Sequence, residues 1–189
     1  MNKKTQTVVG LGILTAIVIV LQALAVNVRF GAFSVTFVLA PIIIGAALYG
    51  YKAGAWLGLV FGAVVLLTDA GAFLAINVPG TIATCILKGV VAGLAAGAVY
   101  KLFEKKNKVL AVVLAGITAP VCNTGLFLVG CRLFFFETIK AWGAAAGYEN
   151  PAKFMLVGFV GMNFVVELVI NLVLAAAIVR IVTAVSKAN

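Results

Sequence analysis

"APVCNTGLFLVGCRLFFF", residues 119–136, is apolar enough for the interior of a lipid bilayer and yet carries several groups that hydrocarbon disfavours. These exceptions are Pro120, Asn123, Thr124 and Arg132. A polar group in hydrocarbon costs free energy unless it finds a partner. The segment therefore predicts a membrane helix whose polar side chains contact either a neighbouring helix or a bound molecule.

The rest of the composition extends this interpretation to the whole chain. Of 189 residues, 65% are hydrophobic and 10% are charged, and the mean hydropathy is +1.24. A soluble domain of this length could not bury so much apolar surface, so we expect an integral membrane protein. The first apolar run follows Lys3 and Lys4 and lacks a small-x-small cleavage site before a polar region. It therefore predicts a first transmembrane helix, and not a removable signal peptide.

The composition of the chain argues against several functional classes. The net charge is +9, but no basic stripe alternates with aromatic residues, which argues against nucleic-acid binding. Histidine is absent, so the usual proton shuttle, metal ligand and catalytic base are missing. Cys85, Cys122 and Cys131 lie inside apolar runs without C-x-x-C spacing, which is typical of small core residues. We expect no metal site, no catalytic residue and no enzyme activity.

The apolar runs predict a compact bundle of six transmembrane helices in a single domain over residues 1–189. A bilayer core about 30 Å thick needs roughly 20 helical residues. The predicted spans are 7–26, 35–51, 53–68, 80–102, 109–131 and 153–183. The second and third are joined tightly at Tyr49-Gly50-Tyr51-Lys52, and Gly147 with Asn150-Pro151 predicts a loop between the fifth and sixth.

The distribution of basic residues predicts the orientation of the bundle. With the N-terminus inside, nine Lys and Arg residues are cytoplasmic and four are external, while Lys88 lies within a span. The positive-inside rule therefore places both termini in the cytoplasm. The "KLFEKKNK" run is then a cytoplasmic turn.

Glycine ladders mark two of the predicted helices. One contains Gly54, Gly58 and Gly62, and the other contains Gly89, Gly93 and Gly97. A four-residue interval keeps the glycines on one face, where another backbone can approach closely, so we expect packing inside the bundle. A weaker small-residue face on the first helix contains Gly12 and Ala16, and it can serve either internal packing or docking of another membrane protein.

Polar residues in three predicted helices lie at similar depth below the outer surface. At 1.5 Å per residue, Lys88 and Asn123 are each roughly 12 Å down and Asn163 is roughly 15 Å down. Glu167 and Asn171 follow Asn163 by four and eight positions, so one face of the last helix is polar. With Arg132 at the rim, this pattern predicts a pocket open to the outside.

The outer loops supply further candidates for the rim of this pocket, namely Arg29, Asn77, Trp142 and Tyr148. A structural alternative remains open for the buried groups. Lys88 and Glu167 could neutralise each other, and the asparagines could tie helices together. Pro120 fits either case, because a proline inside a helix frees a carbonyl and invites a kink.

The chain shows no P-loop G-x-x-x-x-G-K-[ST] and no visible inverted repeat. A binding pocket without an energy source indicates a subunit of a larger transporter. The chain resembles the substrate-binding S components of energy-coupling factor (ECF) transporters, in the branch with riboflavin and pantothenate proteins. The resemblance spans nearly the whole chain and rests on four stretches: "LGILTAIVIVLQAL", "FSVTFVLAPIIIGAALYGYKAGAWLGLVFG", "INVPGTIATCILKGVVAGLAAG" and "APVCNTGLFLVGC".

This resemblance implies a site, partners and a location. A vitamin would bind near the outer face, between loops at 27–36, 69–79 and 132–152 and the last three helices. The implied partners are a transmembrane coupling protein and two cytoplasmic ATPases, which use the ATP, so no cofactor is expected in this chain. Gly12 and Ala16 would dock the coupling protein, and the membrane would be the plasma membrane of a prokaryote.

The ligand is expected to be a carboxylated vitamin or precursor. Riboflavin-binding members carry F-S-D-x-P near the second helix, whereas this chain has "FSVTFVLAP" without an acid. Arg29, Lys88 and Arg132 on the ligand side would suit a carboxylate, so pantothenate is the first choice, ahead of lipoate and similar precursors. The predicted ligand contacts are Arg29, Asn77, Lys88, Asn123, Thr124, Arg132, Asn163 and Glu167.

Other functional classes remain as alternatives. The main one is a stand-alone channel or exporter, which would show no dependence on an ATPase. A membrane enzyme is disfavoured because the chain lacks histidine and Asp69 has no neighbouring aspartate. A purely structural subunit would not need the predicted polar cluster.

Overall fold

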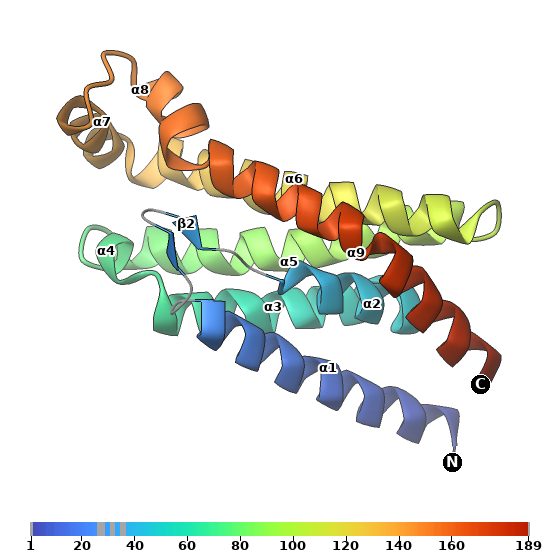
Figure 1. The fold of residues 1–189 in the computed structure, drawn as a ribbon. Helices are drawn as coiled ribbons and strands as arrows, with labels where there is room; N and C mark the ends of the chain where they lie inside the picture. The colour runs from blue at the N-terminus through green and yellow to red at the C-terminus, as the bar shows by residue number, and fades with distance from the viewer. Residues whose placement is uncertain (1, 26–28, 31–32, 35–36, 189) are drawn as a thin grey trace.

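A computed structural model describes residues 2–25, 29–30, 33–34 and 37–188 of the chain. The described part is a bundle of helices, as the apolar runs predict (Figure 1). Its longest elements are α1 (Lys3–Ala25), α3 (Tyr51–Thr68), α5 (Val78–Phe103), α6 (Lys108–Phe134) and α9 (Gly161–Ala188). Its shorter elements are α2 (Leu39–Tyr49), α4 (Gly71–Leu74), α7 (Phe136–Ala145), α8 (Pro151–Lys153) and the π-helix η1 (Phe154–Phe159).

The number of membrane-crossing helices differs from the expectation at one element. Within the described residues, five helical segments are long and apolar enough to cross a membrane, the last of them running over Pro151–Val185. The predicted span 35–51 corresponds to α2, which begins at Leu39 and has 11 residues. At 1.5 Å per residue α2 covers about 16 Å, roughly half of a bilayer core. The described residues therefore contain five helices of spanning length and one shorter apolar helix, and the predicted count of six spans stays a prediction.

Both ends of the chain lie at the same end of the bundle (Figure 1). The opposite end holds α4, α7, α8 and a small β-hairpin. This arrangement fits the predicted placement of both termini on one side of the membrane. Which side that is remains a prediction from the positive-inside rule.

The connecting segments contain more regular structure than the sequence indicates. In the predicted loop 27–36, strands β1 (Arg29–Phe30) and β2 (Phe33–Ser34) pair antiparallel, and the other residues of that loop lie outside the described parts. The expected all-α fold therefore also contains this short pair of β-strands. The predicted loop 132–152 is largely helical, because α6 continues to Phe134 and α7 follows. Gly147 has φ +81°, which confirms a turn before Asn150-Pro151.

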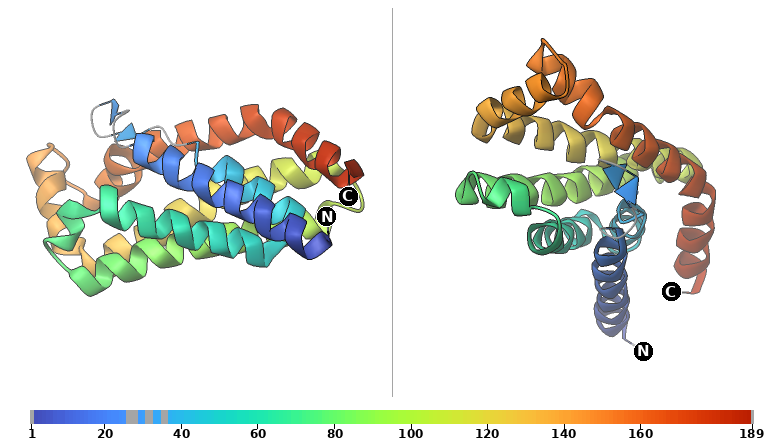
Figure 2. Two further views of the ribbon diagram at one scale, coloured as in Figure 1. Left: turned by 90° about the horizontal axis from the view of Figure 1, so that it is seen from below. Right: turned by 60° about the vertical axis from the view of Figure 1, so that its left-hand side comes forward.

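The glycine ladders pack against each other between α3 and α5, which lie side by side in Figures 1 and 2. A Cβ at Gly58 would collide with the backbone carbonyl of Gly89, and a Cβ at Gly89 would collide with that of Gly58. Gly54 and Gly93 block each other in the same reciprocal way. The predicted internal packing is confirmed, and it joins α3 and α5 at backbone contact distance.

The short helix α2 lies at the centre of the bundle and α1 at its edge (Figure 2). Ile42 and Ile43 of α2 are completely buried, together with Leu57 of α3. By contrast, Gly12 on α1 is exposed and nothing lies within 4 Å of a Cβ built there. Ala16 is exposed as well. The small-residue face of α1 is therefore open in the isolated chain, and does not pack inside the bundle.

Candidate ligand-binding site

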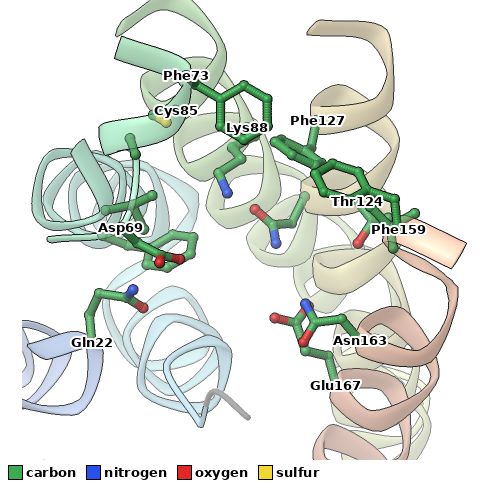
Figure 3. Close-up of a pocket in the computed structure, with 15 residues that line it drawn as sticks. Gln22, Asp69, Phe73, Cys85, Lys88, Thr124, Phe127, Phe159, Asn163 and Glu167 are labelled. Atoms are coloured by element: carbon green, nitrogen blue, oxygen red, sulfur yellow. The ribbon is translucent and has the colours of Figure 1, made fainter. Parts of the chain in front are cut away.

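A cavity of about 260 Å³ lies among α3, α5, α6 and α9, near the end of the bundle that holds α4 (Figure 3). Its polar lining consists of Gln22, Asp69, Cys85, Lys88, Asn123, Thr124, Asn163 and Glu167. Its apolar lining consists of Phe61, Val65, Ala70, Phe73, Phe127, Phe159 and Val160. Membrane-protein polar groups that converge on a cavity in this way are a candidate binding site.

The structure brings polar residues of three helices together, as the sequence predicts. Lys88 of α5, Asn123 of α6 and Asn163 of α9 all line the cavity. Lys88 lies ten residues after the start of α5, Asn123 lies eleven residues before the end of α6, and Asn163 lies twelve residues after Pro151, where the last apolar segment begins. Thr124 and Glu167 line the cavity as well. Of the eight predicted ligand contacts, these five are brought together.

Lys88 presents its ammonium group between two aromatic rings. Its Nζ lies 5.6 Å from the ring centroid of Phe61 and 5.2 Å from that of Phe127. Both distances are within the range of a cation–π attraction. The rings stabilise the charge, and they accept no conventional hydrogen bond from it.

Amide oxygens form the second polar feature of the lining. The side-chain oxygens Gln22 Oε1, Asn123 Oδ1 and Asn163 Oδ1 are buried and have no hydrogen-bond partner. Gln22 and Asn123 are 3% and 6% exposed. A buried acceptor without a partner costs about 1–3 kcal/mol. Such oxygens mark places where a bound molecule can donate hydrogen bonds.

Two carboxylates complete the polar lining. Glu167 of α9 is 3% exposed, whereas Asp69, which follows α3 directly, is exposed. Asn171 does not line the cavity; its Nδ2 donates to the backbone carbonyl of Glu167 at 2.8 Å. This hydrogen bond lies within α9, so it does not tie two helices together.

An aromatic cluster closes the cavity toward α7. Phe73 of α4 is at its centre, with ring centroids 5.7 Å from Phe127 and 4.9 Å from Phe135. Trp142 lies 5.7 Å and Phe159 lies 6.3 Å from the same ring. Because α4 is a single helical turn, these contacts hold it in place beside the cavity.

A π-helical turn brings the last segment to the cavity wall. In η1 the wider winding ends where the Val160 N–H donates to the carbonyl of Met155, and Phe159 and Val160 both line the cavity. π-Helical turns are found frequently at functional sites. The sequence contains no clear signal for this turn.

Three predicted ligand contacts lie elsewhere or outside the described residues. Asn77 is the N-cap of α5, where its Oδ1 accepts from the Gly80 N–H at 2.9 Å. Arg132 is exposed at the end of α6, with its guanidinium carbon 4.0 Å from the ring centroid of Phe136. Neither residue is part of the cavity lining. The side chain of Arg29 lies outside the described residues, so its role stays a prediction.

Sequence reasoning did not select several lining residues. Gln22 carried a usable signal, because it is a polar residue inside the apolar run of the first helix. Asp69 was considered only as a catalytic candidate. The aromatic members gave no signal, since the chain contains 13 phenylalanines and nothing in their spacing distinguishes Phe73 or Phe127.

A comparison with protein families assigns the chain to one of them. Residues 6–179 match the family described as ECF transporter, substrate-specific component. The chain belongs to this family. The S component is thus part of a transporter and is not an enzyme, and its apolar helices make it a multi-pass membrane protein.

A named relative agrees with this assignment. The S component is 28% identical over 200 aligned positions to the pantothenic acid transporter PanT of Lactococcus lactis subsp. cremoris (strain MG1363). The alignment covers 96% of this chain and 96% of that protein. No solved structure matches the S component significantly. Among the described residues, no cluster of three or more acidic or cysteine side chains could hold a metal ion.

Proposed function

We propose that the S component captures a small carboxylated vitamin or vitamin precursor for uptake, with pantothenate as the first candidate. The observation that carries this proposal is the position of Lys88. Lys88 lines the cavity, and its ammonium group lies beside the rings of Phe61 and Phe127. A carboxylate is the natural partner for a cation placed in this way.

The size and polarity of the cavity support a small polar ligand. About 260 Å³ is slightly below the volumes usual for small-molecule sites, which favours a short molecule over a flavin. Pantothenate combines a carboxylate at one end, hydroxyls at the other and an amide between them. The relative named for pantothenic acid is similar over nearly its whole length.

The remaining parts of the proposal concern location and partners. The protein would lie in the plasma membrane of a prokaryote, with the cavity facing outward. A transmembrane coupling protein and two cytoplasmic ATPases would supply the energy, so this chain would need no cofactor of its own. The exposed Gly12 and Ala16 leave the first helix free to dock the coupling protein.

The proposal is tested by the small molecules that the protein carries. The detergent-purified S component, expressed in pantothenate-containing medium, is denatured and the released molecules are identified by mass spectrometry. We expect near-stoichiometric pantothenate from the wild type and from Lys101→Met, and much less from Lys88→Met. Lys101 is a matched control because it lies on the same helix, 5.8 Å from the ring centroid of Tyr51, and outside the cavity.

A different outcome would redirect the assignment. Stoichiometric release of a vitamin without a carboxylate would contradict the role given to Lys88. Absence of any released vitamin, together with pantothenate flux through liposomes that contain the S component alone, would favour the stand-alone channel.

A further inference from the structure

We propose that the cavity binds its ligand in one direction, with the anionic group at Lys88 and O–H or N–H donors at Gln22 and Asn163. Gln22 is then a specificity-determining contact on α1. This inference rests on the proposed function, because it assumes a carboxylated ligand.

The charges of the described lining residues favour this orientation over the reverse one. Lys88 is the cation among the described lining residues, whereas Asp69 and Glu167 are acids. A ligand carboxylate close to either acid would be repelled, and more strongly inside the membrane, where the dielectric constant is low. Figure 3 shows Asp69 to one side of Lys88 and Glu167 across the cavity from it. Placing the anionic end of the ligand beside Lys88 is therefore favoured.

Acceptor oxygens gather on the side of the cavity that faces Lys88. In Figure 3, Gln22 and Asn163 lie across the cavity from the ammonium and point toward its interior. Gln22 is 3% exposed, and the side-chain oxygens of both residues are buried without a hydrogen-bond partner. Hydroxyl or amide N–H groups of a ligand would satisfy these oxygens, while a second carboxylate or an ether oxygen would not.

Gln22 lies on a different helix from Lys88, so the two proposed ligand contacts come from separate parts of the bundle. Gln22 is the described lining residue contributed by α1, whereas Lys88 belongs to α5. A ligand bound in the proposed direction links these two helices across the cavity. The hydroxyl end of the ligand then contacts α1 at the edge of the bundle. Its acidic end contacts α5, which packs against α3 through the glycine ladders.

Two probes that differ only at the acidic end test the direction. Pantothenate and pantothenyl alcohol, in which a hydroxymethyl group replaces the carboxylate, are titrated calorimetrically into the full-length protein purified in detergent. We expect the wild type to prefer pantothenate by about tenfold or more, since the alcohol lacks the charge-assisted contact. Lys88→Met is expected to abolish this preference, and Lys101→Met to retain it.

Gln22→Leu is expected to change the affinities for the two probes in a different way from Lys88→Met. Both probes should bind about tenfold more weakly, and the preference for the acid should remain, because the lost contact is with the shared hydroxyl end. The melting temperature of the ligand-free variant should not fall, since the substitution removes a buried acceptor without a partner. A merely structural Gln22 would instead show a lower melting temperature. Gln6→Leu is the control, because Gln6 lies on the same helix outside the cavity.

The possible results separate this inference from the proposed function. Equal affinity of the wild type for the two probes would overturn the direction, and so would a loss of acid preference in Gln22→Leu. Unchanged affinities in Gln22→Leu would overturn the role of Gln22. If Lys88→Met does not fold, the wild-type preference decides the position of the acid. If the wild type binds neither probe, the proposed function fails, and the inference fails with it.

Discussion

The ammonium nitrogen of Lys88 lies 5.2 Å from the ring centroid of Phe127, and this pair connects α5 to α6 at the wall of the cavity. The ring stabilises a charge that would otherwise be costly at this depth in a membrane. The arrangement therefore places a cation at the cavity wall, where it can pair with an anionic group of a ligand.

Removing this ring should weaken ligand binding without unfolding the protein. For Phe127→Leu we expect pantothenate affinity to fall by about 1 kcal/mol, since the lost cation–π contact no longer positions the ammonium. Phe127→Tyr should bind nearly as the wild type does. Phe136→Leu is a matched control, because that ring holds Arg132 outside the cavity. Calorimetry measures the affinities, and an equal loss in Phe136→Leu would contradict the assignment.

The reciprocal packing of Gly58 and Gly89 predicts a stability effect. Gly58→Ala should lower the free energy of unfolding by about 1–3 kcal/mol, because its methyl group would meet the backbone of α5 and force the helices apart. Gly12→Ala should not destabilise the protein, since its Cβ would meet nothing within 4 Å. Thermal unfolding in detergent compares the two variants. Equal melting temperatures would refute close α3–α5 contact.

Asn77 can be tested as a helix cap against its sequence-based role as a ligand contact. Asn77→Ala should cost about 1 kcal/mol of stability, because the Gly80 N–H loses its acceptor, and Asn77→Asp should restore most of it. Pantothenate affinity should be unchanged in both variants. Asn107→Ala removes the equivalent cap of α6 at the other end of the bundle and is the control. A tenfold loss of affinity at unchanged stability would make Asn77 a ligand contact after all.

Trp142 should report ligand binding through its fluorescence. Its ring lies 5.7 Å from Phe73 and 6.0 Å from Phe159, and both of these rings line the cavity. The chain has two tryptophans, and Trp56 is exposed on α3, where its Nε1 donates to Thr15. In Trp56→Phe we expect a saturable change of emission on ligand addition. Trp142→Phe should bind with the same affinity and give no such signal.

The amino-acid sequence alone determined the class of the protein and the depth of its polar groups. The long apolar runs required membrane helices, because no soluble core could hold them. Helical rise then placed Lys88, Asn123 and Asn163 at one level, and these residues do line one cavity. The glycine ladders were also recognised as internal packing, since four-residue spacing leaves few other uses for them.

The tertiary structure decided which side chains meet, because a depth along a helix does not fix the direction in which that helix faces. Helix rotation directs Gln22 into the cavity and leaves Arg132 outside it. Phe73 joins the lining because ring contacts hold the single turn of α4 beside α6, and the Phe159 position depends on a π-helical turn. These outcomes depend on packing between segments far apart in the chain, which local spacing does not encode.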